Sequence, residues 1–274
     1  MATTKGRTYR YSLPVRVSHW LNALCLAILV MSGLQIFNAH PALYWGEDSE
    51  FDRPLFSISA GRATGGRAIG ITRVFGWSFE TTGVLGRSTL KGRAVQRAFP
   101  GWSTLPSEQD LATGRVWHFF FAWLFVLNGL AYLAYSLSSR HLSRDLLPSR
   151  EHWKRLGHVW RGVLIAALGR GEDRAQYNVI QRVTYLVVIL VLGPLVVFTG
   201  LTMSPAVDAA APWLLDIFGG RQSARTIHFG TTWILVLFLF VHVAMVLMSG
   251  LRNNLRSMTT GWYGLGEVPS HDER

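Results

Sequence analysis

Four long stretches of the chain contain no charged residue. They run over Val17–Gly46, Val116–Ser139, Val183–Val207 and Thr226–Leu251, and aliphatic and aromatic residues dominate each of them. Each exceeds the ~20 residues that an α-helix needs to cross a ~30 Å hydrocarbon core. The pattern predicts four transmembrane helices, at about residues 17–38, 115–138, 182–204 and 226–251, in an all-α membrane protein built as a four-helix bundle.

Composition and charge agree with a membrane protein. Charged residues make up 16% of the 274 residues, whereas soluble domains average roughly 25%. The formal net charge of +11 could in principle indicate nucleic acid, but the apolar stretches offer no polar face to water. We therefore expect no nucleic-acid partner and assign the basic excess to loops and tails, where it can meet membrane lipid.

We expect the first stretch to be a span and not a cleaved signal peptide, because it is longer than a usual signal core.

The basic residues predict the orientation. With the N-terminus inside, the inner segments carry 16 basic and 7 acidic residues, and the outer loops carry 11 and 9. Cytoplasmic flanks are the basic ones, so both termini and the loop at about 139–181 are expected inside. The long loop at about 39–114 is expected outside.

The long outer loop is rich in glycine, which favours short strands or turns. Within it, the stretch Leu85–Phe99 interleaves apolar residues with Arg87, Lys91, Arg93 and Arg97. This pattern fits a surface helix on lipid headgroups, and a simply solvated loop is about equally compatible. Because loops of this length usually have a function, we take it as the docking surface for an extracytoplasmic partner.

Four of the nine histidines fall inside the predicted spans: His19, His118, His228 and His242. Ionisable side chains in a bilayer are costly and indicate function. His228 and His242 are 14 residues apart, which places them on one helix face with a rise of about 21 Å. That spacing suits ligands for two separate cofactors on opposite sides of the membrane.

An arginine precedes three of these histidines by one helical turn. The motif occurs as Arg16-Val-Ser-His19, Arg115-Val-Trp-His118 and Arg225-Thr-Ile-His228. Residues three apart share a helix face. If each arginine marks the edge of the hydrocarbon core, each of these histidines lies about 4.5 Å inside it. The arginines are placed to pair with acidic groups of whatever the histidines bind.

The same depths predict two histidine pairs. His118 and His228 lie at the same level near the outer face, whereas His242, about 21 Å further along its helix, reaches the level of His19 near the inner face. Two opposed imidazoles are the axial ligands of a b-type haem, and the arginines would meet its propionates. Zinc is the alternative, but it usually needs four ligands close together.

Such haems carry electrons, because two axial histidines leave no open position on the iron. Gly33, Gly129 and Gly200 lie within the spans and could admit a flat porphyrin; close helix packing explains them equally well. The single Cys25 excludes an internal disulfide and a covalently attached c-type haem.

At these residues the chain resembles the di-haem cytochrome b subunits of nickel-iron hydrogenases, formate dehydrogenases and thiosulfate reductases, the bacterial cytochrome b561 type. The resemblance implies one haem between the first and fourth helices and the other between the second and fourth. The 14-residue histidine spacing is its most specific feature. The long outer loop looks more like that of members paired with periplasmic molybdopterin oxidoreductases.

The resemblance also implies a quinone site at the inner end of the third span. The family motif is present as Tyr177-Asn178-Val179-Ile180-Gln181-Arg182. Asn178 and Gln181 are three residues apart and can donate hydrogen bonds to a quinone carbonyl. Helix capping by Asn178 is an equally good explanation.

The sequence thus predicts one membrane cytochrome b domain over residues 1–274, multi-pass in a bacterial inner membrane. It would bind two haems b and carry electrons between a periplasmic oxidoreductase and quinone. Two alternatives stay open: a stand-alone superoxide:quinone oxidoreductase, and a non-redox, histidine-based metal-binding transporter.

Overall fold

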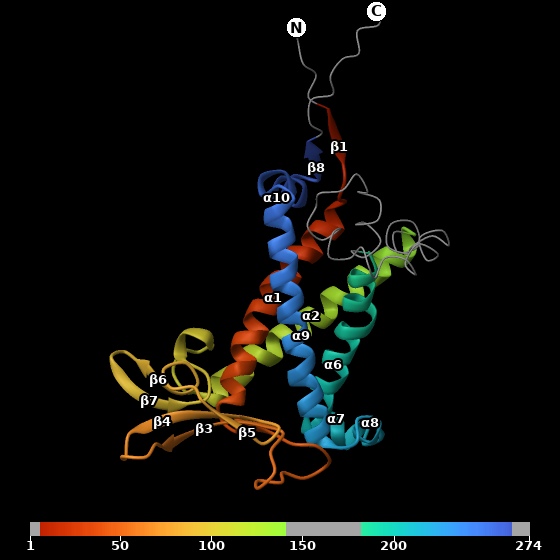
Figure 1. Ribbon diagram of the computed structural model, residues 1–274. Helices are drawn as coiled ribbons and strands as arrows, with labels where there is room; N and C mark the ends of the chain where they lie inside the picture. The colour runs from red at the N-terminus through yellow and green to blue at the C-terminus, as the bar shows by residue number, and fades with distance from the viewer. Residues whose placement is uncertain (1–5, 141–181, 265–274) are drawn as a thin grey trace, which may run out of the picture. The chain divides into compact units, whose positions relative to one another are not determined.

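The computed structural model describes residues 6–140 and 182–264. Four helices in this part of the chain are long and apolar enough to cross a membrane (Figure 1). They are α1 (Leu13–Phe37), α2 (Leu111–Ser138), a third helix over Arg182–Thr202 that ends in α6 (Gly193–Thr202), and α9 (Arg221–Met248). The prediction of four membrane-length helices is therefore confirmed.

Three of these helices begin four or five residues before the predicted spans. As a result Arg16, Arg115 and Arg225 are helical residues. The α2 start is fixed by Asp110, whose carboxylate accepts a hydrogen bond from the Thr113 backbone N–H (3.0 Å) and acts as its cap. The charge-free run marks the apolar part of a helix, and backbone hydrogen bonding continues beyond it.

The third helix contains a π-helical turn, η3 (Val188–Leu192), immediately before Gly193 and Pro194. Proline lacks an N–H and its ring clashes with the carbonyl four residues earlier. A wider turn at this position accommodates that clash.

The chain divides into two compact units. Within the described residues, the β-layer unit comprises 23–127 and 191–234, and the terminal unit comprises 6–22, 128–140, 182–190 and 235–264.

Between α1 and α2 the β-layer unit contains six strands and a short 3-10 helix. The protein is therefore mostly helical and not all-α, and the short strands or turns expected in the long loop are strands. The sheet has the order β2-β3-β4-β5, and β6 pairs with β7. The elements are β2 (Ala42–Leu43), β3 (Phe56–Arg62), β4 (Ala68–Val74), β5 (Trp77–Glu80), β6 (Gly86–Leu90), β7 (Arg93–Arg97) and η1 (Gly101–Ser103). Two short helices, α7 (Pro205–Ala210) and α8 (Trp213–Ile217), precede α9.

The surface helix expected over residues 85–99 is instead the β6–β7 hairpin. Lys91 and Gly92 have φ angles of 49° and 77°, which is the geometry of a two-residue hairpin turn and breaks a helix. The charged residues recur with the period of a strand, and short stretches of this kind are ambiguous between the two periods.

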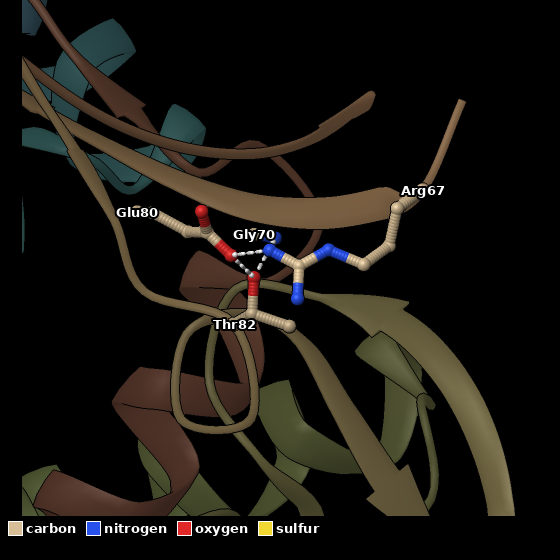
Figure 2. A network of polar contacts seen from close by, with 4 residues as sticks. All are labelled: Arg67, Gly70, Glu80 and Thr82. Carbon is tan, nitrogen blue, oxygen red and sulfur yellow. Dashed lines mark hydrogen bonds and ion pairs between the residues drawn. The ribbon is translucent and has the colours of Figure 1, made fainter. Parts of the chain in front are cut away.

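A polar network fixes the end of β5 to β4. Glu80 accepts hydrogen bonds from Arg67 and Thr82, both at 3.0 Å, and the Thr82 hydroxyl accepts one from the Gly70 backbone N–H (Figure 2). Gly70 is required here, because a methyl group on its Cα would overlap the Leu85 carbonyl oxygen.

The β-layer packs on the C-terminal end of α1. Its buried apolar cluster comprises Leu34, Phe37, Leu43, Ile58, Ala98 and Phe99. Arg97, which was expected on a lipid-facing surface, is also buried. Its guanidinium donates to the Ser107 carbonyl (2.6 Å), Gln35 (2.8 Å) and Thr104 (2.9 Å). Burial lowers the Arg97 pKa from its usual value, and these acceptors compensate for lost hydration.

We expect Arg97→Met to destabilise the protein by about 2 kcal/mol, because it leaves the buried Gln35 side-chain oxygen without a donor and removes the donor to the Ser107 carbonyl. Thermal unfolding in detergent measures this loss. Arg93→Met is the matched control, since Arg93 lies on the same strand and is exposed. Equal stability of the two variants would contradict the anchoring role of Arg97.

The terminal unit contains the two ends of the described chain. β1 (Arg7–Tyr9) pairs antiparallel with β8 (Trp262–Gly264), and α10 (Leu251–Thr260) follows a break at Gly250, whose φ is 105°. Within the spans, the Asn128 amide donates to the Ser18 carbonyl (3.0 Å) and to Asn22 (2.7 Å). This contact links α2 to α1 in an apolar environment, where polar side chains pair between helices.

Candidate functional site

The four histidines of the spans lie in two pairs. In the β-layer unit, the ring centroids of His118 on α2 and His228 on α9 are 6.3 Å apart, with an angle of 64° between the rings. In the terminal unit, His19 on α1 and His242 on α9 are 6.1 Å apart, with an angle of 55°. These are the two combinations that the helix geometry predicted.

This separation fits one metal ion between each pair of rings. Two metal–nitrogen bonds of about 2 Å, with about 1 Å from each nitrogen to its ring centre, place two imidazole centres roughly 6 Å apart. Over residues 6–140 and 182–264, no group of three or more His, Cys, Asp or Glu side chains could hold a metal ion. Two opposed ligands suit an axially ligated haem better than a tetrahedral zinc.

Hydrogen bonds define the protonation of His118. The fully buried Ser32 hydroxyl donates its single proton to the Ile28 carbonyl (2.6 Å). With the hydroxyl proton assigned to Ile28, the Ser32 oxygen accepts at its 3.0 Å contact with His118 Nδ1. The proton of the neutral ring sits on Nδ1, and the Nε2 lone pair is left for a metal.

His228 is held in the same way from α6. Its Nδ1 lies 2.9 Å from the Val196 carbonyl oxygen and 3.2 Å from the Thr199 hydroxyl, which itself donates to the Leu195 carbonyl (2.7 Å). The Val196 carbonyl oxygen can only accept, so Nδ1 carries the proton and Nε2 is again available.

Two of the three glycines suggested to admit a porphyrin lie against these rings. A Cβ on Gly33 would be 3.3 Å from His118 Cε1, and one on Gly200 would be 3.2 Å from His228 Cε1. No atom of the described chain lies within 4 Å of a Cβ on Gly129. Gly33 and Gly200 thus make room for imidazole edges, a role distinct from the suggested approach of a porphyrin.

The surroundings of His19 and His242 are aromatic. Phe238 stacks on His242 (5.8 Å), Tyr185 meets it edge-on (6.4 Å), and Trp20 meets His19 edge-on (5.2 Å). Among the described residues, the buried Nδ1 of His19 has no hydrogen-bond partner. The His19 ring is therefore held by contacts with neighbouring rings, and no described hydrogen-bond acceptor fixes its Nδ1.

The three arginines of the repeated motif have different contacts. Arg16 donates to the Thr259 carbonyl at the end of α10. The Arg115 guanidinium lies 5.6 Å from the centre of the Phe119 ring. Arg225 donates to the backbone carbonyls of Ala42 (2.9 Å) and His40, so part of its donor capacity anchors the segment that leaves α1.

Asn178 and Gln181, the predicted quinone-binding residues, lie outside the described residues.

Sequence reasoning missed Ser32, Thr199 and Val196, which hold the His118–His228 pair. A hydroxyl residue followed by glycine occurs at residues 32–33 and 199–200, but it also occurs at 249–250 in the fourth apolar stretch, so this pattern alone does not identify them.

Apolar membrane-length helices that bring histidines together in pairs are the features of a membrane-bound b-type cytochrome. Comparison with known proteins agrees. The chain belongs to the prokaryotic cytochrome b561 family, whose model matches residues 10–261. It is therefore a multi-pass membrane haem protein of an electron-transfer family.

Two relatives show where such chains occur. A protein of Azospira oryzae that bears the name of a protein-methionine-sulfoxide reductase subunit, YedZ1, is 29% identical over 237 residues, covering 85% of this chain and 87% of its own length. A protein of Cupriavidus necator named as a B-type cytochrome subunit of a Ni/Fe hydrogenase is 21% identical over 271 residues, covering 93% and 86%. No solved structure gives a significant match.

Proposed function

We propose that this protein holds two haems b and carries electrons across a bacterial inner membrane, between a periplasmic oxidoreductase and the quinone pool. His118 and His228 would ligate the outer haem, and His19 and His242 the inner haem. The observation that carries the proposal is that both histidine pairs have ring centroids 6.1–6.3 Å apart, the spacing that a single iron between two imidazoles requires.

Bound haem supplies one-electron chemistry at the iron. The chain supplies rigid ligands: the Nδ1 protons of His118 and His228 are fixed by acceptors from α1 and α6, so their Nε2 atoms need no reorganisation. With two histidines at each site, a bound haem iron would have no position for a substrate, so the proposed role is electron transfer and not bond chemistry.

The arginines would bind the haem propionates from the ends of the helices. Arg115 and Arg225 come one turn before the outer ligands, and Arg16 comes one turn before the inner ligand His19. For Arg225 this role would use the guanidinium capacity that remains beside its two backbone acceptors.

Quinone would bind near the inner haem, with Asn178 and Gln181 donating hydrogen bonds to its carbonyls. The aromatic contact between Tyr185 and His242 supports this location, because Tyr185 follows Gln181 by four residues in the sequence. Both termini would be cytoplasmic, as the basic inner segments favour.

The partner would be a molybdopterin-type oxidoreductase docked on the segment between α1 and α2. The 29% identical relative that is named as a reductase subunit supports an oxidoreductase partner. The folded β-layer offers a structured surface for it, in place of the expected lipid-bound helix.

A reduced-minus-oxidised absorption spectrum of the detergent-purified protein, with haem quantified per chain, tests the proposal. We expect about two non-covalent haems with low-spin bands, reducible through a quinol. Protein from haem-sufficient cells without haem, or with one haem, would refute it. Turnover of superoxide by the purified chain without a partner would favour the stand-alone alternative.

A further inference from the structure

The two ligands of the His118–His228 pair are held by the same local device on two different helices. On α1 the device is Ser32–Gly33, and on α6 it is Thr199–Gly200; we call each a hydroxyl–glycine pair. In each, the hydroxyl contacts Nδ1 of the ring and the following glycine leaves room for Cε1.

The correspondence extends to the backbone. Ser32 donates to the carbonyl four residues earlier at 2.6 Å and lies 3.3 Å from the one three residues earlier; Thr199 shows 2.7 and 3.3 Å. The carbonyl oxygen of Val196, three residues before Thr199, also lies 2.9 Å from His228 Nδ1. Each ring thus has a hydroxyl oxygen at Nδ1, and His228 has a backbone carbonyl there as well.

The device is absent from the other pair within the described chain. His19 Nδ1 has no hydrogen-bond partner there, and the side chains around His19 and His242 are aromatic. The two sites therefore differ in the groups that contact their ligands.

From this difference we infer that Ser32 and Thr199 are positioning residues that lower the reduction potential of the outer haem. An acceptor at Nδ1–H increases the electron density on the imidazole, which makes it a better donor at Nε2 and stabilises the oxidised iron. Glycine at the next position lets the ring approach the acceptor. The inference rests on the proposed haem ligation, and it concerns a one-electron couple with no bond made or broken.

The test is redox potentiometry of the purified protein, monitored by absorption. In the double variant Ser32→Ala/Thr199→Val, we expect the reduced-to-oxidised ratio of the outer haem at a fixed ambient potential to rise about tenfold, which is 59 mV for one electron. The inner haem should be unchanged. Each single variant should give part of the shift, because the two residues lie on different helices.

Conservative variants and a matched control distinguish an effect on the reduction potential from a structural disturbance. Ser32→Thr and Thr199→Ser retain the hydroxyl and should keep the wild-type potential. Thr202→Val is the matched control, since Thr202 is buried one turn after Thr199 and donates to the Thr199 carbonyl (2.7 Å). The low-spin electron paramagnetic resonance signal of the outer haem should shift in the double variant but not in the two conservative variants or in Thr202→Val.

The haem that is lost in His118→Ala identifies which component of the potentiometric titration curve belongs to the outer haem. If wild-type protein binds two haems and the double variant leaves both potentials unchanged, the inference is wrong and the proposed function stands. If both potentials shift equally, the effect is global and the inference is also wrong. Wild-type protein without two haems would instead refute the proposed function.

Discussion

Replacing His118 by alanine should reduce the haem content from about two to about one per chain, with the outer haem lost. His118 is one of two ligands, and a single remaining imidazole cannot hold low-spin haem firmly. His242→Ala should also leave about one haem, but the inner one. The two variants should therefore keep different haems, distinguishable by their potentials and by the effect of adding Thr199→Val, which shifts the outer haem only.

A rescue experiment controls for misfolding. In His118→Gly, free imidazole can enter the space of the missing side chain and restore the axial ligand, so haem binding should recover with added imidazole. Two haems in both alanine variants, or loss of the same haem in both, would contradict the pairing of the histidines.

Leucine at position 200 should abolish binding of the outer haem. A Cβ there would lie 3.2 Å from His228 Cε1, which is already a tight contact, and leucine adds three further carbon atoms to that Cβ. The imidazole would have to leave the acceptors that fix it. Alanine at the same position requires a shift of only a few tenths of an ångström and should retain the haem with a changed potential.

Gly230→Leu is the matched control for this variant. Gly230 lies two residues after His228 on α9, is exposed, and has no atom of the described chain within 4 Å of its Cβ position. Haem content should stay at the wild-type level. Retention of both haems in Gly200→Leu would show that the glycine is not needed for the position of His228.

The sequence was sufficient to identify the helices and the histidine pairs. A bilayer accepts only segments that satisfy their own backbone hydrogen bonds and present apolar side chains, so charge-free runs of more than 20 residues predict helices directly. Once the helices are known, their period and rise place His228 and His242 on one face and assign each a partner. These steps depend on local geometry and on the thickness of the membrane.

The strand-containing segment was predicted less well. Residues 85–99 fitted a surface helix, and the structure shows a hairpin whose turn lies at Lys91 and Gly92. Short amphipathic stretches satisfy both periods about equally. The choice is made by pairing between the two strands and by Arg97, whose burial depends on acceptors from α1 and from the η1 region.

The sequence by itself therefore determined the membrane class, the four helices and the histidines that meet. Only the tertiary structure showed which groups hold those histidines, because Ser32 lies 86 residues from His118, and Thr199 lies 29 residues from His228. Contacts between residues so far apart depend on how helices pack, and the apolar pattern that marks a span leaves the rotation of one helix against its neighbour undetermined. That rotation decides which hydroxyl meets which imidazole.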